Sequence, residues 1–295
     1  MTQDIFVPRL TARRRWGHVF TAVCLCMTLF GAFVLTVLIA SVLGFGGKWL
    51  SVNFLTAYPS QMWPEESGIK SALFGTLWLM GLTTVCAVPL GMGAAIYLHE
   101  YATQNRLTRF IELNIANLAG VPSIIYGILG LTIFVRYLHP LTGGRSVLAG
   151  ALTLSLLVLP IIIIASREAL AAVPESFRQA AYAVGATRWQ TIWSHVLPPA
   201  LPGMMTGVIL ALSRAIGEAA PLIVLGALTW LAFVPTSPKD PFVALPIQIF
   251  NWADQADPVF QELAGAAIIV LLGILLPMNA IAVGIRAWHQ RAKAW

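Results

Sequence analysis

Charged residues are scarce in this chain, at 10% of its 295 residues, whereas hydrophobic residues make up 58%. A soluble protein of this size needs more charge to cover its surface, so the composition excludes an ordinary water-soluble domain. The mean hydropathy of +0.80 indicates instead that lipid is the main solvent. Polar segments long enough to form a separate domain are also lacking. We therefore expect one integral membrane domain.

Cysteine and histidine are few as well. The three cysteines, Cys24, Cys26 and Cys86, lie in apolar segments, and their spacing fits neither a disulfide framework nor a zinc site. The five histidines occur singly at segment ends, which disfavours a haem or metal core built from paired histidines. The pattern GxxxxGKS or GxxxxGKT of a phosphate-binding loop is absent, so the chain is not an ATPase of that type. We expect no cofactor, no metal and no catalytic residues.

Long apolar runs are what the sequence has instead. Six of them are long enough to cross a bilayer: residues 16–44, 70–98, 110–135, 146–166, 200–231 and 263–285. The first follows a cluster of arginines, but it is too long for a signal-peptide core, so we expect an uncleaved anchor. The predicted fold is all-α. It has six transmembrane helices in residues 16–290, after an N-terminal segment 1–15 and before a tail 291–295.

Lysine and arginine are unevenly divided between the loops. Twelve fall in the N-terminal segment, the 99–109 loop, the 167–198 loop and the tail, whereas five fall in the three alternate loops. Because basic residues collect on the cytoplasmic side, this distribution places both termini in the cytoplasm. The net charge of +6 then reflects topology, and no aromatic and basic platform points to nucleic acid as a partner.

One apolar run carries two opposite charges. Arg214 and Glu218 lie four residues apart in the 200–231 run. In a continuous helix Arg214 would lie roughly 22 Å past Pro199, near mid-membrane. Charges there are costly, so they normally face a bundle interior, pair with each other and mark a substrate path. The pair predicts that Arg214 contacts an anion and that Glu218 neutralises the charge of Arg214 when the path is empty. A buried ion pair that only fixes the helix register is the alternative.

The 167–198 loop is too polar to span a bilayer, yet it is strongly patterned. Pro174 and Glu175 suit the first turn of a helix, whose apolar face would hold residues 177, 181 and 184. Gly185 should end this helix with a positive φ. Such a short amphipathic helix, held between membrane spans, is suited to the groove of a partner protein.

A second short helix should follow the glycine. Thr187 and Gln190 have the spacing of a capping box. Four apolar residues would share one face of this helix: Trp189, Ile192, Trp193 and Val196. Two prolines, Pro198 and Pro199, would end it. The loop would then form a rigid knob of two helices.

These residues carry a resemblance to a known family. The run of Gln179, Ala180 and Ala181, with Gly185, Ile192, Leu197 and Pro198 following, resembles the EAA loop of ABC importer permeases, with glutamine in place of the usual first glutamate. Four further segments resemble the PstA-type permease of the phosphate ABC importer: PLGMGAAIYLHEY (89–101), AGVPSIIYG (119–127), SRAIGEAAPLI (213–223) and PIQIFNW (246–252). The likeness covers roughly residues 70–290.

The resemblance implies a type I ABC permease fold in the inner membrane, with a cytoplasmic coupling helix that docks on an ATPase through the EAA-like residues. It implies four kinds of partner: a second, PstC-type permease, a dimer of the PstB-type ATPase, an extracytoplasmic PstS-type binding protein, and inorganic phosphate as substrate. ATP would be hydrolysed by the separate subunit and not by this chain.

Four residues are expected along the substrate path. Arg214 offers paired donors to phosphate oxygens, with Glu218 beside it. Ser123 could add a hydroxyl, as could Tyr126, although either could instead bond to a neighbouring helix. Arg167 would be the second arginine that the resemblance suggests, but some relatives place it one turn earlier, at the position of Ile164. Arg167 could also snorkel to the interface.

Other readings remain open. The intramembrane charges also suit a proton-coupled secondary transporter, which the EAA-like loop and the lack of an inverted second half disfavour. A membrane-embedded hydrolase would need a nucleophile, base and metal set, which is not found. Within the ABC class, a permease for molybdate or sulfate, or the partner phosphate permease, stays possible, and the neighbouring genes would decide.

Overall fold

The computed structural model describes residues 10–103, 105–227 and 230–292, and within these ranges it is helical with no strand. The long helices are α1 (Leu10–Gly46), α3 (Lys70–Ile96), α7 (Val147–Ala171), α10 (Leu197–Ile216) and α13 (Pro258–Ala292). The shorter ones are α2 (Val52–Thr56), α4 (Arg106–Ala119), α5 (Ser123–Gly130), α6 (His139–Thr142), α8 (Glu175–Ala183), α9 (Arg188–Thr191), α11 (Ala220–Leu225) and α12 (Leu245–Ala253). Short π-helical turns occupy Tyr97–Tyr101, Leu131–Tyr137 and Ile192–Val196, and 3₁₀ turns occupy Gly47–Trp49 and Pro64–Glu66.

Five of these helices are long and apolar enough to cross a membrane, and the bent pair of α4 with α5 would make a sixth crossing. The predicted runs 16–44, 70–98, 146–166 and 263–285 correspond to α1, to α3 with the start of the π-helical turn after it, to α7 and to α13. The all-α prediction is confirmed, and the protein is a multi-pass membrane protein.

The run predicted at residues 110–135 is not one helix. The segments Arg106–Ala119 and Ser123–Tyr137 meet at 104°. Pro122 explains the break, because a proline disfavours helical backbone in the residue before it. The Tyr126 hydroxyl donates to the carbonyl of Leu118 at 2.8 Å and ties the two arms together.

The run predicted at residues 200–231 is also broken, which corrects the expectation of a single continuous crossing. α10 ends at Ile216, and α11 begins after a short gap with Pro221 in its first turn. Pro221 has no N–H to give to the carbonyl of Gly217, and its ring would clash with that carbonyl in a continuous helix. α11 then ends at Gly226, whose φ is +83°. The predicted run therefore contains two helices.

α7 forms the centre of the bundle between α3 and α10. In its most apolar window 67% of the residues are buried, against 0% in α1. Glycines allow the close packing, because a side chain at these positions would clash with the neighbouring helix. A Cβ added at Gly207 of α10 would lie 2.4 Å from the Cβ of Ala165, and one added at Gly91 of α3 would lie 2.6 Å from Ile162. This is the usual role of small residues between membrane helices.

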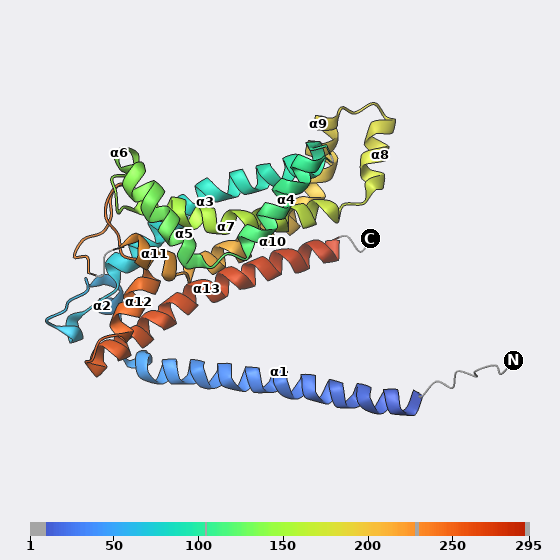
Figure 1. Ribbon diagram of the computed structural model, residues 1–295. Helices are drawn as coiled ribbons and strands as arrows, with labels where there is room; N and C mark the ends of the chain where they lie inside the picture. Colours follow the sequence, from blue (N-terminus) through green and yellow to red (C-terminus); the bar gives the residue numbers. More distant parts are fainter. Residues whose placement is uncertain (1–9, 104, 228–229, 293–295) are drawn as a thin grey trace.

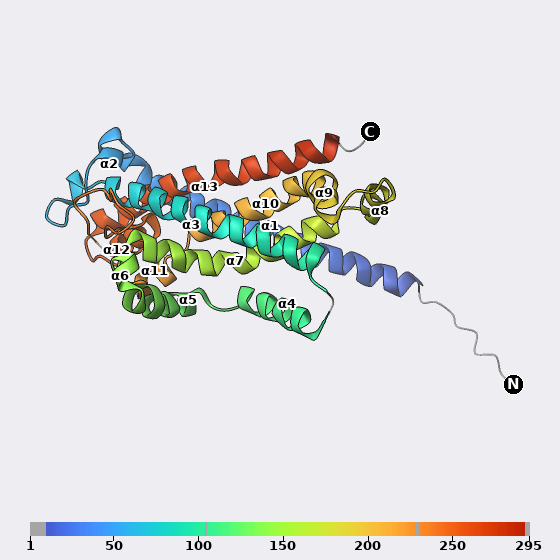
Figure 2. The same ribbon diagram turned by 90° about the horizontal axis from the view of Figure 1, so that it is seen from above.

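The two ends of the bundle differ. The first turns of α1 and the last turns of α13 lie at the same end as α8 and α9, whereas α2, α6 and α12 lie at the opposite end (Figure 1). The helices α3, α7 and α10 run side by side between the two ends (Figure 2). α1 diverges from the bundle and meets α13 near Gly46, where a Cβ would lie 2.3 Å from the Ala266 nitrogen. Most of the predicted segment 1–15, and residues 293–295 of the predicted tail, lie outside the described residues.

Candidate functional site

The intramembrane charge pair lies where α10 ends. Arg214 is in the last turn of α10, and its Nε donates to Oε1 of Glu218 at 3.4 Å. Glu218 lies just beyond the helix, where its backbone N–H donates to the carbonyl of Ala215 at 3.2 Å. The pairing is confirmed, but its placement in the middle of a continuous helix is wrong. The negative end of the α10 dipole favours a cation at this position.

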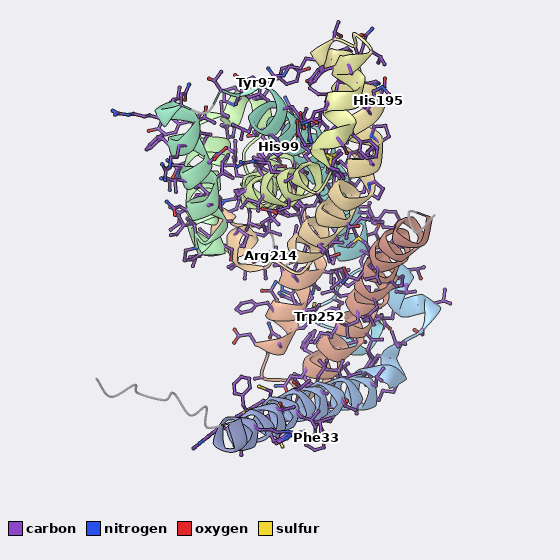
Figure 3. The ribbon with its side chains drawn as sticks, turned by 90° about the vertical axis from the view of Figure 1, so that its right-hand side faces the viewer. Phe33, Tyr97, His99, His195, Arg214 and Trp252 are labelled. Carbon is purple, nitrogen blue, oxygen red and sulfur yellow. The ribbon has the colours of Figure 1, made fainter. Side chains whose placement is uncertain are left out.

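The arginine of this pair is the more accessible partner. The Arg214 side chain is 51% exposed and that of Glu218 18%. Among the described residues, no acceptor bonds to either Nη group of Arg214. In the view along the bundle, Arg214 lies between the α4 and α5 side and the α12 and α13 side (Figure 3). The geometry lets Glu218 hold Nε while the outer edge of the guanidinium is free to bind an oxyanion.

The two broken spans meet beside this pair. A Cβ at Gly127 of α5 would lie 2.7 Å from the carbonyl oxygen of Pro221, the proline that begins α11. Tyr126 is 5% exposed and belongs to the same buried cluster as Ala211 and Ala215 of α10. Broken helices are tolerated at membrane depth where they are buried in protein or line a path, so this meeting of two breaks is a candidate translocation site.

The predicted hydroxyl donors differ in their roles. Ser123 is the first residue of α5 and is half-buried, three residues before Tyr126. Tyr126 uses its own hydroxyl to bond Leu118. Ser123 as a substrate contact therefore stays a prediction, whereas the Tyr126 donor closes the bend between α4 and α5.

Arg167 is not brought to Arg214. Its Nη2 donates to Oε1 of Glu112 on α4 at 2.8 Å, and the two side chains are 28% and 23% exposed. The guanidinium thus joins α7 to α4. The sequence analysis missed Glu112, because no local pattern pairs two residues that lie 55 positions apart. A role for Arg167 in the substrate path stays a prediction.

The first helix of the patterned loop is formed as predicted. α8 follows Pro174 and ends in a Schellman motif: the N–H of Gly185 donates to Tyr182 at 3.0 Å and that of Ala186 to Ala181 at 3.1 Å. Gly185 has a φ of +84°. The positive φ expected for this glycine is confirmed.

The second helix begins as predicted but does not end as predicted. Thr187 and Gln190 form a capping box at the start of α9. Pro198 and Pro199 do not end the helix, because the π-helical turn Ile192–Val196 carries it directly into α10. In that turn the N–H of Leu197 reaches back five residues to Ile192. The prolines occupy the first turn of α10, where their missing N–H groups cost little.

The EAA-like residues fall into a buried and an exposed set. Ala181, Ile192 and Leu197 are buried at 4%, 2% and 8% exposure. Gln179, Ala180, Gly185 and Pro198 are exposed. The predicted face of α8 is confirmed as one wall of a shallow groove, which is lined by Ser176, Phe177, Ala180, Ala181, Val184 and His195.

The predicted single face of the second helix is wrong. Ile192 and Val196 are buried, whereas Trp189 and Trp193 are 60% and 58% exposed. The two indole rings stack on each other at 5.4 Å. The four residues form two stripes, Trp189 with Trp193 and Ile192 with Val196, each at a spacing of four residues. The wider π-helical turn rotates the tryptophans away from the buried pair.

Three charged residues that the sequence analysis did not assign to the site fasten this loop to the bundle. Arg178 of α8 is 8% exposed, and it bonds the carboxylate of Glu100, which follows α3, at 2.6 Å. Arg188 of α9 donates to the backbone carbonyl of Glu100. The hydrogen bond that Arg178 donates to the Glu100 carboxylate raises the pKa of Arg178 above its usual value. Glu100 lies within the segment 89–101 that carries the resemblance, but only the fold shows its partners.

Comparison with known proteins identifies the family. Residues 87–294 match the model of the binding-protein-dependent transport system inner membrane component. The chain belongs to this family. It is 33% identical to the probable ABC transporter permease protein YqgI of Bacillus subtilis, over 88% of this chain and 90% of that one.

Two further relatives are phosphate transport system permease proteins. PstA of Yersinia pestis is 32% identical over 92% of this chain and 90% of its own length. PstA 1 of Mycobacterium tuberculosis strain H37Rv is 42% identical over 55% of this chain and 52% of its own length.

Among solved structures, the bacterial alginate ABC transporter in complex with its periplasmic protein aligns with a TM-score of 0.64, at 17% identity, over 92% of this chain and 93% of that one. A MetNI methionine ABC transporter chain aligns with a TM-score of 0.57 at 17% identity, over 74% of this chain and 94% of that one. The protein has the ABC importer permease fold and is a transport subunit, not an enzyme.

Proposed function

We propose that this chain is the membrane permease subunit of an importer that moves inorganic phosphate into the cytoplasm at the expense of ATP hydrolysed on another subunit. The observation that carries the proposal is the half-exposed Arg214 at the meeting of two broken spans. The names of the relatives, two of which are phosphate transport permeases at 32% and 42% identity, support phosphate as the anion.

The chemistry of the pair suits transport better than tight binding. Phosphate that leaves water needs a positive charge and hydrogen-bond donors, which the planar guanidinium of Arg214 offers. Glu218 lies 3.4 Å from the Arg214 Nε and offsets its charge when no anion is present. A competing carboxylate keeps the site weak enough to release the anion, as conduction requires.

Partners follow from the family. Permeases of this family depend on a binding protein, and the related alginate transporter was solved with its periplasmic protein. For this chain we propose a PstC-type second permease, two PstB-type ATPase subunits that dock on α8 and α9, and a PstS-type binding protein. Four features of the loop support the docking: the groove on α8, its exposed alanine, the positive φ of Gly185 and the capping box.

A transport assay tests the proposal. The chain, assembled with a PstC-type permease, a PstB-type ATPase and a PstS-type binding protein from the same organism, would be placed in proteoliposomes and supplied with ATP and radiolabelled phosphate. We expect ATP-dependent phosphate uptake that excess unlabelled phosphate abolishes and excess sulfate or molybdate leaves largely intact. Uptake of sulfate or molybdate in preference to phosphate would contradict the proposed substrate, and uptake without ATP would contradict the importer class.

The orientation of the protein can be tested separately. The proposal puts α8, α9 and both termini in the cytoplasm and the loop between α12 and α13 outside. Val184 is 83% exposed, and Asp254 is exposed at the other end. Arg178, although in the same loop as Val184, is buried and is a poor site for labelling.

In a background without Cys24, Cys26 and Cys86, we expect Asp254→Cys to react with an impermeant thiol reagent in intact cells. Val184→Cys should react only after the membrane is opened, and more slowly when the ATPase is bound. Labelling of both sites in intact cells would contradict the six-crossing topology and the docking role of α8.

A further inference from the structure

The inner end of α3 is a π-helical turn that both helices of the docking loop hold. The turn spans Tyr97–Tyr101 and closes with a hydrogen bond from Ala102 to Tyr97 at 2.9 Å. Glu100 lies in this turn with only 7% of its surface exposed. Turns of this kind are concentrated at functional positions in helices, and a buried carboxylate there requires an explanation.

α8 holds Glu100 through Arg178. The Arg178 guanidinium makes a two-point contact with the carboxylate, Nη2 to Oε1 at 2.6 Å and Nε to Oε2 at 3.3 Å. Its remaining donors bond the carbonyls of Val173 at 3.0 Å and Leu170 at 3.3 Å, at the end of α7, and the exposed Glu175 at 3.3 Å. One side chain thus joins the ends of α3 and α7 to the docking helix. His99 also faces the Glu100 carboxylate, at 3.8 Å.

α9 holds the same turn through a second arginine, Arg188. Nη2 of Arg188 donates to the backbone carbonyl of Glu100, and the Arg188 guanidinium lies 5.2 Å from the centre of the Tyr101 ring. Arg188 is the first residue of α9. Each helix of the loop therefore bonds Glu100, in the turn that follows α3, through an arginine.

α3 is also fastened at its outer end. The Thr76 hydroxyl accepts a hydrogen bond from the N–H of Leu245, the first residue of α12, at 2.9 Å. A Cβ at Gly75 would lie 2.0 Å from the carbonyl oxygen of Val243, so the backbones of α3 and of the segment before α12 are in direct contact. α3 thus connects the docking loop at one end of the molecule to the segment before α12 at the other.

From these contacts we infer that Glu100 is a positioning residue for coupling: the Glu100 and Arg178 ion pair makes α3 move together with α8 and α9, so that displacement of the loop by the ATPase reaches the outer end of the permease. The inference rests on the proposed docking of α8 and α9 on the ATPase. Arginine is required for the link, because its fork bonds both carboxylate oxygens and two carbonyls at once, whereas the three donors of a lysine cannot make all four contacts. The pair is buried, so water does not replace its contacts when one partner is changed.

Two conservative variants test the inference in the complete reconstituted importer. Glu100→Gln keeps the shape and one acceptor but loses the charge, and Arg178→Lys keeps the charge but loses the fork. We expect both complexes to assemble with the ATPase and to keep basal ATP hydrolysis, while stimulation by the loaded binding protein falls about 10-fold, within the usual range of coupling between sites. Glu175→Gln is the matched control: it removes a partner of the same arginine, but this carboxylate is 65% exposed and should matter little.

A chemical bridge provides the second measurement. Glu100→Cys with Arg178→Cys, in a background without the three native cysteines, should be uncoupled when its thiols are free. Joining the two thiols with a short bifunctional reagent should restore stimulated hydrolysis, since the bridge replaces the mechanical link but not the charges. Unchanged stimulation in Glu100→Gln, failure to assemble, or a bridge that restores nothing would each overturn the inference.

The proposed docking of α8 on the ATPase can be measured separately. Val184→Cys should cross-link to the ATPase in an otherwise unaltered complex, because Val184 lies at the exposed end of α8. Absence of this cross-link would contradict the docking proposal itself. A normal cross-link together with unchanged coupling in Glu100→Gln would overturn only the role of Glu100.

Discussion

Arg214→Ala is expected to abolish phosphate uptake while the complex stays assembled. The substitution removes the half-exposed cation and leaves Glu218 alone at the break, where its charge repels the anion. Each charge-assisted hydrogen bond contributes about 1.5–3 kcal/mol, so the loss of two lowers transport roughly 100-fold or more. The measurement is uptake of radiolabelled phosphate in proteoliposomes, alongside co-purification of the ATPase.

The neighbouring Ser213 provides a control on the same turn of α10. Its hydroxyl bonds Asn279 of α13 at 2.7 Å, so Ser213→Ala tests the packing of α10 on α13 without changing the charge. We expect this variant to keep most of its uptake. Normal uptake in Arg214→Ala would contradict the substrate role of the arginine. Failure of that variant to assemble would favour the alternative, an ion pair that only fixes helix register between two permeases.

Gly185→Val is expected to separate substrate binding from ATP hydrolysis. Gly185 has a φ of +84°, and a Cβ there would meet nothing within 4 Å, so the whole cost of the substitution lies in the backbone. That cost is about 1–2 kcal/mol for a residue forced into the left-handed region, and more for a β-branched one. Relief of the strain would change the angle between α8 and α9. Hydrolysis stimulated by the loaded binding protein should fall several-fold, while the binding protein still docks.

Gly185→Asn is the matched control, because asparagine tolerates a positive φ better than other side chains. It should keep most of the stimulated hydrolysis, which is measured in the same reconstituted complex as that of Gly185→Val. Equal loss in both variants would mean that a side chain at this position blocks the partner, not that the turn matters. Unchanged coupling in Gly185→Val would place the docking element elsewhere.

The features that local sequence could predict are those whose physical cause is local. Apolar runs longer than a bilayer's width dictate membrane helices, and α1, α3, α7 and α13 formed where expected. A glycine between two helical patterns predicts a left-handed turn, and Gly185 has one. The capping box at Thr187 and the pairing of Arg214 with Glu218 follow from spacings of three and four residues.

Other features depended on the balance between local signals and packing. Pro198 and Pro199 read as the end of a helix, but a proline is equally suited to a first turn, and the π-helical turn before them made the continuous helix possible. Pro122 and Pro221 lie inside apolar runs that were each predicted as one span, yet each proline stands at the start of a separate helix. The sequence marks where the backbone loses a donor, and the packing of α5 against α11 decides how far the helices turn apart.

The sequence by itself determined the membrane class, the family resemblance, and α8, the glycine turn and the capping box of the 167–198 loop, because hydrophobicity, turn chemistry and capping act over a few residues. Only the tertiary structure decided which charges meet. Glu100 and Arg178 lie 78 positions apart, and Arg167 and Glu112 lie 55 apart, yet each pair bonds within 3 Å. Such pairs are specified by the packing of α3 and α4 against α7 and by the placement of α8 beside the end of α3, because a charge buried there is stable only beside its opposite.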